Sequence, residues 1–276
     1  MPELPEVELV TRSLDEAVRG RQIANAVLIR GRLAPHTDPA SFAKHLKNGV
    51  INRVHRRGKH ILIELSSNRT LITHLRLSGR FLLLTPDDIN PKFTYAVFEF
   101  DDDQRLVFED QRHFGLMKIA DTHELFETDE LRKLAPEPFS AEFSDGYFYG
   151  TLRGSKRNVK ELLLDQSKVC GLGNIYASEA LFLSGINPKS AANRNSAKRA
   201  ALLRLRILDV LNEAIRFAEM IPRDPVRIGE GVYGNGSVTS WRVYDRENEP
   251  CPNCSRPIAR IRQGGRSTYY CRRCQR

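Results

Sequence analysis

The first eight residues, Met1-Pro2-Glu3-Leu4-Pro5-Glu6-Val7-Glu8, contain groups that could do covalent chemistry. If Met1 is removed, Pro2 presents a secondary α-amine. Amines of this kind titrate at about 7.7–8.0 in peptides, so a part of the population is neutral and nucleophilic. Such an amine can attack an aldehyde-like carbon and form an iminium, and the neighbouring Glu3 could move the protons. The alternative is an ordinary helix start with acidic residues in its first turn.

The segments that follow would position these groups. Val7, Val10, Leu14 and Ala17 recur at helical spacing and predict an opening helix with one buried face. Short apolar stretches separated by turn residues then predict an antiparallel β-sandwich or barrel, which we place at residues 1–131. The expected strands are 23–33, 50–55, 59–65, 70–75, 81–84, 95–100, 105–108 and 116–119. Residues 132–147, with prolines at 136 and 138, are expected to form a linker.

The second half of the chain has a helical pattern, and we assign a helical domain to residues 148–222. Helices are expected over 159–164, 174–184 and 197–220, the last capped by Ser196. Its expected buried stripe consists of Leu202, Leu205, Leu208, Leu211, Ile215 and Ala218. Gly171-Leu172-Gly173-Asn174 precedes the second helix, where backbone N–H groups suit a phosphate, although glycine turns between helices are common. Residues 223–244 are expected to form a loop that could act as a lid, with a connecting strand over 238–244.

The last segment, residues 245–276, carries two C-x2-C pairs, Cys251 with Cys254 and Cys271 with Cys274. This spacing is typical of a four-cysteine zinc ribbon. Four thiolates leave no open coordination position, so the zinc would be structural. It would hold a hairpin over 258–270 with Arg266 at the tip, where a guanidinium can bind DNA phosphate. A ribbon that binds protein is the alternative. The lone Cys170 is expected to be a buried thiol.

The composition favours a polyanionic partner. The net charge is +9 over 276 residues, and residues 251–276 contain seven arginines and no acidic residue. Nucleic acid is the expected partner, and a basic but unspecialised enzyme is the alternative. No apolar run approaches the ~18 residues of a membrane span, and the N-terminus lacks the pattern of a secretory signal. We therefore expect a cytoplasmic bacterial protein that acts at the nucleoid.

Together these motifs resemble those of formamidopyrimidine-DNA glycosylase, a bacterial base-excision repair family that acts on oxidised purines. The resemblance extends over essentially the whole chain. In order, its motifs are Met1-Pro2-Glu3-Leu4-Pro5-Glu6, Arg57-Gly58-Lys59, His74-Leu75-Arg76-Leu77-Ser78-Gly79, Asp110-Gln111-Arg112-His113-Phe114-Gly115, Gly171-Leu172-Gly173-Asn174-Ile175-Tyr176-Ala177-Ser178-Glu179 and the four-cysteine finger.

The resemblance implies a multidomain α+β enzyme: an N-terminal antiparallel β-sandwich with an opening helix, then a helix–two-turn–helix domain with a zinc finger. It implies a monomer that binds double-stranded DNA containing oxidised bases or abasic sites. Pro2 would attack C1′ of the damaged nucleotide, Glu3 would be the general acid and base, and Lys59, on a strand, would assist elimination. The product would be a strand cleaved by β,δ-elimination, without a redox cofactor.

The resemblance also assigns a DNA-binding set. Leu77, Arg112 and Phe114 would fill the gap left by the extruded nucleotide, since a stacked base cannot be attacked at its sugar carbon. Asn174 and Arg266 would bind phosphates beside the lesion, and His74 belongs to the same set. Without the resemblance, Leu77 and Phe114 would be read as core residues.

Three departures from the family pattern bear on the choice of lesion. Leu77 stands where methionine is more usual, Gln111-Arg112-His113 replaces Pro-Arg-Arg, and the loop at 222–240 is unlike the typical lesion-capping loop. An endonuclease VIII-like glycosylase for oxidised pyrimidines is the nearest alternative. A non-catalytic DNA-binding zinc-finger protein is a second, and a zinc-ribbon factor that binds RNA or protein is a third, which leaves the N-terminus unexplained.

Overall fold

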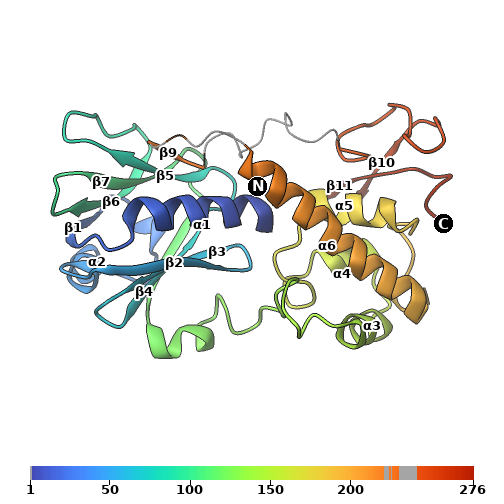
Figure 1. Cartoon of the computed structure of the whole chain (residues 1–276), viewed down its shortest axis with the longest axis horizontal. Coiled ribbons are helices and arrows are strands. Elements are labelled where there is room, and N and C mark those ends of the chain that lie inside the picture. The colour runs from blue at the N-terminus through green and yellow to red at the C-terminus, as the bar shows by residue number, and fades with distance from the viewer. Residues whose placement is uncertain (1, 221–223, 225, 230–240) are drawn as a thin grey trace. The chain divides into compact units, whose positions relative to one another are not determined.

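The computed structural model describes residues 2–220, 224, 226–229 and 241–276, and the chain divides into two compact units (Figure 1). The N-terminal unit comprises Met1–Arg132 and Ala218–Asn235, and the C-terminal unit comprises Lys133–Phe217 and Gly236–Arg276. Among the described residues, the structure contains no helix with the length and apolar character needed to cross a membrane.

Two antiparallel sheets form the N-terminal unit, which confirms the predicted β-sandwich. One has the order β2-β3-β4-β8 and the other β1-β6-β7-β5-β9. Their strands are β1 (Ile23–Leu28), β2 (Ile51–Arg57), β3 (His60–Leu65), β4 (Arg69–His74), β5 (Gly79–Leu84), β6 (Thr94–Phe100), β7 (Arg105–Asp110), β8 (Leu116–Asp121) and β9 (Arg227–Ile228). Alternate residues of both sheets, such as Ile61, Ile63, Phe98 and Phe108, bury their side chains in one shared core.

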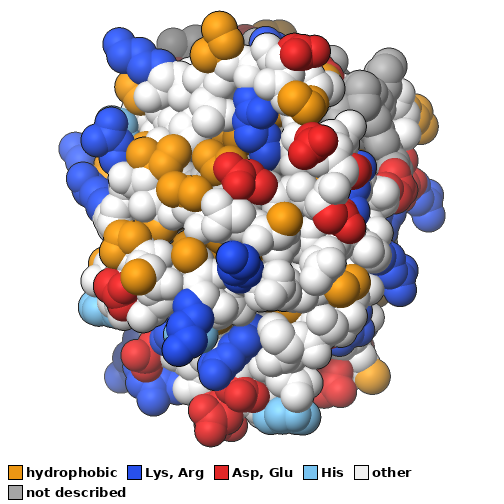
Figure 2. Space-filling model, turned by 90° about the vertical axis from the view of Figure 1, so that its left-hand side faces the viewer, with side chains coloured by type: hydrophobic (Ala, Val, Ile, Leu, Met, Phe, Trp, Pro, Cys, Tyr) orange, Lys and Arg blue, Asp and Glu red, His pale blue; other side chains and the backbone are white. Residues whose placement is uncertain are grey.

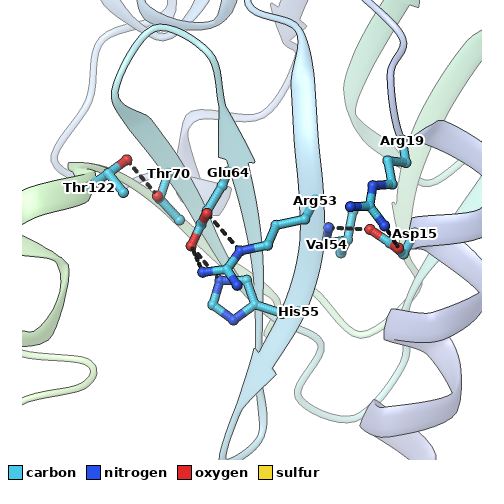
Figure 3. Close-up of polar contacts among 8 residues, drawn as sticks. All are labelled: Asp15, Arg19, Arg53, Val54, His55, Glu64, Thr70 and Thr122. Atoms are coloured by element: carbon cyan, nitrogen blue, oxygen red, sulfur yellow. Dashed lines mark hydrogen bonds and ion pairs between the residues drawn. The ribbon is translucent and has the colours of Figure 1, made fainter.

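The opening helix α1 (Leu4–Val18) packs into that same core. Val7, Val10 and Leu14 are at most 1% exposed, as expected from their spacing, whereas Ala17 is only partly buried and Val18 completes the buried face. Asp15 also joins α1 to β2, because its Oδ1 accepts the backbone N–H of Val54 at 2.6 Å (Figure 3). The helix is therefore fixed to the sandwich both by apolar burial and by a backbone hydrogen bond.

Hydrogen bonds and ion pairs join side chains of neighbouring strands in the sheet β2-β3-β4-β8 (Figure 3). Glu64 of β3 accepts two hydrogen bonds of 2.8 Å from the Arg53 guanidinium, and its Oε1 lies 2.7 Å from Nε2 of His55. The Arg53 fork and the His55 charge hold the pKa of Glu64 below its usual value.

At the end of the unit seen in Figure 2, basic, acidic and apolar side chains are interspersed, so this face does not carry charge of a single sign.

The sequence prediction missed a helix in the first part of this unit. The strand expected over 23–33 ends at Leu28, and Gly31–Leu33 forms the short 3-10 helix η1. The helix α2 (Pro39–Leu46) follows, begun by Asp38, whose Oδ1 accepts the N–H groups of Ala40 and Ser41 at 3.0 Å. A second 3-10 helix, η2 (Thr122–Glu127), closes the unit.

The C-terminal unit is built from helices and a zinc-finger hairpin. Its elements are α3 (Asp145–Arg153), α4 (Val159–Leu163), α5 (Asn174–Leu183), the 3-10 helix η3 (Ala192–Arg194), α6 (Ala197–Glu219), β10 (Ala259–Gln263) and β11 (Arg266–Tyr270). The prediction for α6 was right in extent and only partly right in its buried face. Leu211 and Ala218 are buried as predicted, but Leu202 and Leu205 are 38% and 49% exposed. The other buried residues of the helix are Ala200, Leu203, Ile207, Val210 and Ala214.

The loop expected around 222–240 lies for the most part outside the described residues. Of its described part, Asp224 accepts the N–H groups of Val226 and Arg227, and β9 then pairs with β5. The strand expected over 238–244 is wrong where it is described, because residues 241–244 are not extended ladder partners. The N–H groups of Arg242, Val243 and Tyr244 instead donate to the buried carboxylate of Glu179, each at 2.9 Å.

Candidate functional site

Pro2 and Glu3 stand at the capped start of α1, whereas chain termini are commonly loose. Both are buried, and Glu3 is 2% exposed. Glu3 is the N-cap of α1: its backbone N–H donates to Oε2 of Glu6 at 2.7 Å, and its carbonyl accepts the N–H of Val7 at 3.0 Å. This capping box fixes the backbone next to Pro2. The prediction that Met1 is removed concerns a residue outside the described part.

Lys59 lies in a turn, and the expectation that it opens a strand is therefore wrong. Arg57 pairs with His60 across β2 and β3, so Gly58 and Lys59 form a two-residue hairpin connection. Gly58 has φ 59°, the left-handed conformation that glycine adopts at the first position of such a turn. Lys59 is only 6% exposed, which departs from the solvated lysine expected of a turn tip.

One arginine connects the opening helix to the Lys59 turn. Nε of Arg56 donates to Oε2 of Glu8 at 2.8 Å, and its Nη1 donates to the carbonyl of Gly58 at 3.1 Å. Burial opposes ionisation of Glu8, but hydrogen bonds from Arg56 and Arg12 outweigh it and lower the Glu8 pKa. Since Asp15 contacts Val54 and Glu8 contacts Arg56, α1 runs antiparallel to β2. The first turn of α1 and the Lys59 turn therefore lie at the same end of the sandwich.

His74 ends β4 opposite His60, with the two rings edge-to-face at 4.8 Å. Burial lowers the pKa of His60 to about 4, and burial with the nearby charges of His60, Arg76 and Lys59 lowers the pKa of His74 to about 2. Nδ1 of His74 accepts the backbone N–H of Arg76 at 3.0 Å. The proton of the neutral ring is therefore on Nε2, which makes His74 an uncharged hydrogen-bond donor.

Three side chains on two neighbouring loops, those of Leu77, Arg112 and Phe114, are exposed, which a core position for Leu77 and Phe114 would not predict. Leu77, between β4 and β5, is 38% exposed, and Phe114, between β7 and β8, is 46% exposed. The Arg112 guanidinium lies 5.8 Å from the centre of the Phe114 ring. An exposed apolar pair with a cation beside it can replace lost base stacking and offer donors to a base.

In the C-terminal unit, the structure brings Asn174 and Arg266 together. Asn174 is the first residue of α5, and its Nδ2 donates to the carbonyl of Ser267 at 3.0 Å. Arg266, the preceding residue, is exposed at the start of β11 beside the turn Gly264-Gly265. A helix N-terminus and an arginine at a hairpin tip both suit phosphate oxygens.

Sequence reasoning missed Lys160, which holds the finger hairpin beside Asn174. Lys160 is 1% exposed, and its Nζ donates to the Ser267 carbonyl at 3.0 Å and to Oγ1 of Thr268 at 2.8 Å. The available sequence signal was weak, because Lys160 lies beside Glu161 in α4, and only the neighbouring Val159, Leu162 and Leu163 are apolar. Glu179 in α5 was also missed as a structural anchor. Cys170 is fully buried, as predicted.

The four finger cysteines fit one structural zinc ion. Their Sγ atoms all lie within 4.8 Å of one another, with 3.9 Å between Cys251 and Cys274 and 3.5 Å between Cys254 and Cys271. Tetrahedral Zn–S bonds of about 2.3 Å place sulfurs about 3.8 Å apart. The backbone N–H of Arg256 lowers the pKa of Cys254 to about 7, whereas burial raises the pKa of Cys251 and of Cys274. The fit to zinc therefore rests on the spacing of the four sulfurs, and a bound ion would itself favour the thiolates. The finger packs on α5 through Phe182, so the metal would stabilise the hairpin that carries Arg266.

Comparisons with known proteins match all three parts of the chain. Residues 1–117 match the sequence family described as the formamidopyrimidine-DNA glycosylase N-terminal domain, 134–224 the H2TH domain of the same enzymes, and 248–276 the zinc finger found in FPG and IleRS. A curated formamidopyrimidine-DNA glycosylase of Bacillus licheniformis is 38% identical over 278 residues and covers 100% of both chains.

Two solved structures of the Lactococcus lactis Fpg protein are similar over 99% of both chains at 32% identity. One, in complex with DNA containing N7-benzyl-Fapy-dG, has a TM-score of 0.90, and the other, in complex with DNA containing an oxidised pyrimidine, has a TM-score of 0.89.

Proposed function

Because the chain belongs to the formamidopyrimidine-DNA glycosylase family, we propose that it is a bifunctional DNA glycosylase and AP lyase that excises oxidised purines from double-stranded DNA. The observation that carries the proposal is the buried Pro2-Glu3 pair at a capped helix start, at the same end of the sandwich as the buried Lys59. We further propose that the protein acts in the bacterial cytoplasm. We also propose that its domains are the sandwich at residues 1–131, the linker at 132–147, the helical domain at 148–222, the loop at 223–244 and the finger at 245–276.

The first chemical step is displacement of the base. The lone pair of the Pro2 nitrogen forms a bond to C1′ of the damaged nucleotide, the C1′–N bond to the base breaks, and the base leaves with a proton. Glu3 protonates O4′ as the sugar ring opens, and the Pro2 nitrogen and C1′ become an iminium. This is Schiff-base catalysis by an amine whose ordinary pKa already lies near neutrality.

The strand is then cleaved by two eliminations. The iminium acidifies the C2′ proton, and loss of this proton expels the 3′ phosphate. Loss of a further sugar proton expels the 5′ phosphate, and water releases the sugar remnant from Pro2. Glu3 moves the protons, and Lys59 contacts phosphate and neutralises the charge that develops on the leaving oxygens.

The DNA would be held by both units. His74, Asn174 and Arg266 are proposed to bind phosphates, and Leu77, Arg112 and Phe114 to fill the gap left by the flipped nucleotide. Oxidised pyrimidines are a second candidate substrate, favoured by the complex of the similar Lactococcus lactis protein with such DNA. Excision rates from 8-oxoguanine·C and thymine-glycol duplexes distinguish the two.

Borohydride trapping tests the nucleophile. Wild-type protein incubated with 8-oxoguanine DNA and borohydride should form a covalent adduct that mass mapping assigns to Pro2. The adduct should be lost when the N-terminal amine is acetylated. Pro5→Ala, which changes the proline in the first turn of α1 and leaves Pro2 in place, should keep the adduct. An adduct that survives acetylation would overturn the assignment of Pro2.

A further inference from the structure

A single buried carboxylate joins the two loops that carry the exposed side chains. Asp110 is the last residue of β7 and is 1% exposed. Its Oδ1 accepts the hydroxyl of Ser78, next to Leu77, and its Oδ2 accepts the N–H of Gly115, next to Phe114, at 2.6 Å. The N–H of Arg112 donates to Oγ of Ser78 at 3.0 Å and lies 3.1 Å from Oδ1 of Asp110. The β4–β5 and β7–β8 loops thus share one hydrogen-bond network.

Both loops also rest on the same buried ring. A Cβ atom at Gly79 would lie 2.7 Å from Cζ of Phe108, and a Cβ atom at Gly115 would lie 2.8 Å from Cε1 and Cζ of that ring. Phe108 is fully buried and packs edge-to-face on Phe81. The absence of side chains at the two glycines therefore allows the loops to approach the core, and the network of Asp110 holds them there.

The residue before each exposed apolar side chain has a left-handed backbone. Arg76, before Leu77, has φ 55°, and His113, before Phe114, has φ 63°. Such conformations in residues other than glycine persist only where the surroundings impose them. The ring of His74 accepts the N–H of Arg76, and the hydroxyl of Tyr95 contacts Nδ1 of His113. The backbone is thus held before and after each exposed side chain. The contacts of His74 and Tyr95 hold the preceding residues, and Asp110 holds the following residues Ser78 and Gly115.

We propose that Asp110, acting through Ser78, is a positioning residue that holds Leu77, Arg112 and Phe114 as one preformed wedge. The inference rests on the proposed function, since the wedge acts on a nucleotide leaving the duplex. A preformed wedge avoids the entropy of ordering two loops at the moment of extrusion. Its effect is confined to the opening of a stacked pair, because Asp110 and Ser78 take no part in bond breaking at the sugar.

The test compares two substrates in single-turnover experiments. Excision of paired 8-oxoguanine requires extrusion of a stacked base, whereas cleavage of a preformed abasic site has no base to unstack. Loss of one hydrogen bond to a charged group corresponds to roughly a 10- to 100-fold change. Ser78→Ala and Asp110→Asn should slow excision of paired 8-oxoguanine by about this factor and leave cleavage of the abasic site near the wild-type rate. Ser78→Thr, which keeps the hydroxyl, should restore excision.

Glu109→Gln is the matched control, since Glu109 is the adjacent buried carboxylate on β7 and its side chain bonds to Arg80. Glu109→Gln should destabilise β7 and therefore slow both reactions by a similar factor. If Asp110 only stabilised the fold, Asp110→Asn would likewise slow both reactions together. That result, or wild-type excision by Ser78→Ala, would overturn the inference. Failure of the proposed function is distinguishable, because the wild-type protein would then yield no adduct through Pro2.

Discussion

Replacing Gly79 by alanine should destabilise the N-terminal unit. The new Cβ would lie 2.6 Å from the carbonyl oxygen of Leu75 and 2.7 Å from Cζ of Phe108. Neither neighbour can give way easily, because the first is backbone and the second is a fully buried ring. The N–H of Gly79 also donates to the Leu75 carbonyl at 3.0 Å, so relief of the clash would strain the bond that closes the turn before Leu77.

The cost follows from these contacts. Overpacking of a close-packed site costs about 1–3 kcal/mol, and a weakened backbone hydrogen bond adds about 1 kcal/mol. The smaller conformational freedom of alanine in the unfolded chain offsets about 0.4–1 kcal/mol of this. We therefore expect a net loss of about 2 kcal/mol, which with a urea dependence of about 2 kcal/mol per molar lowers the unfolding midpoint by roughly 1 M.

Urea unfolding followed by circular dichroism measures this change. Gly31→Ala is the matched control in the same unit, because a Cβ atom there meets nothing within 4 Å, and it should leave the midpoint unchanged or raise it slightly. An unchanged midpoint for Gly79→Ala would show that the turn relaxes without cost. In that case the close approach of the loops to Phe108 would not contribute to their rigidity.

Three further results are expected. Burial lowers the pKa of His60 from 6.5 to about 4, so as the pH falls the unfolded chain binds a proton at His60 before the folded chain does. The free energy of unfolding should therefore fall between pH 6.5 and about 4, and His60→Gln should reduce this fall in the urea midpoints. An identical pH profile for the variant would contradict the burial argument. Chelation of zinc should release about one ion per chain and unfold the finger hairpin. Tight DNA binding should then be lost, while the urea midpoint of the sandwich stays unchanged. If the zinc-free protein still bound DNA tightly, the finger would not be needed for DNA binding. Arg56 reaches Glu8 and Gly58 through two different nitrogens, Nε and Nη1, and the single nitrogen of a lysine does not reproduce this fork. Arg56→Lys should therefore cost about 1–2 kcal/mol and slow abasic-site cleavage. Arg53→Lys, at a 55% exposed side chain, should have little effect on either measurement.

The sandwich could be predicted because its strands are short apolar stretches punctuated by turns, and this pattern is local. The buried face of α6 could not be predicted as easily. Leu202, Leu205, Leu208 and Leu211 recur every three residues, and such a row drifts around a helix of 3.6 residues per turn, so its first members point to solvent. The buried residues Ala200, Leu203, Ile207, Val210 and Ala214 instead follow alternating steps of three and four, which keeps them on one face of the helix. Asp38-Pro39 was a readable start for α2, because aspartate caps and proline suits the first turn.

The site residues could be named from the motif resemblance, but not the contacts that position them. The hydrogen bonds of Asp110, Arg56 and Lys160 join residues that are far apart in the sequence or buried against expectation, and they depend on the register of strands and helices. A charged residue inside a motif does not indicate whether it faces solvent, substrate or a backbone carbonyl. Lys59 illustrates this. Gly58 is visible in the sequence, but the pairing of Arg57 with His60, which places Lys59 in a turn, depends on the register of β2 and β3.

The pairing of β9 with β5 has a consequence for how the protein is synthesised. Residues 226–228 are translated after α3, α4, α5 and α6 of the C-terminal unit, yet they supply the edge partner of β5, and Ile228 lies in the sandwich core at 3% exposure. While the ribosome makes the intervening residues, β5 is an open edge that can recruit strands of other nascent chains. A fragment that ends at Arg132 should therefore self-associate, and a peptide spanning 224–229 added in trans should reduce that aggregation.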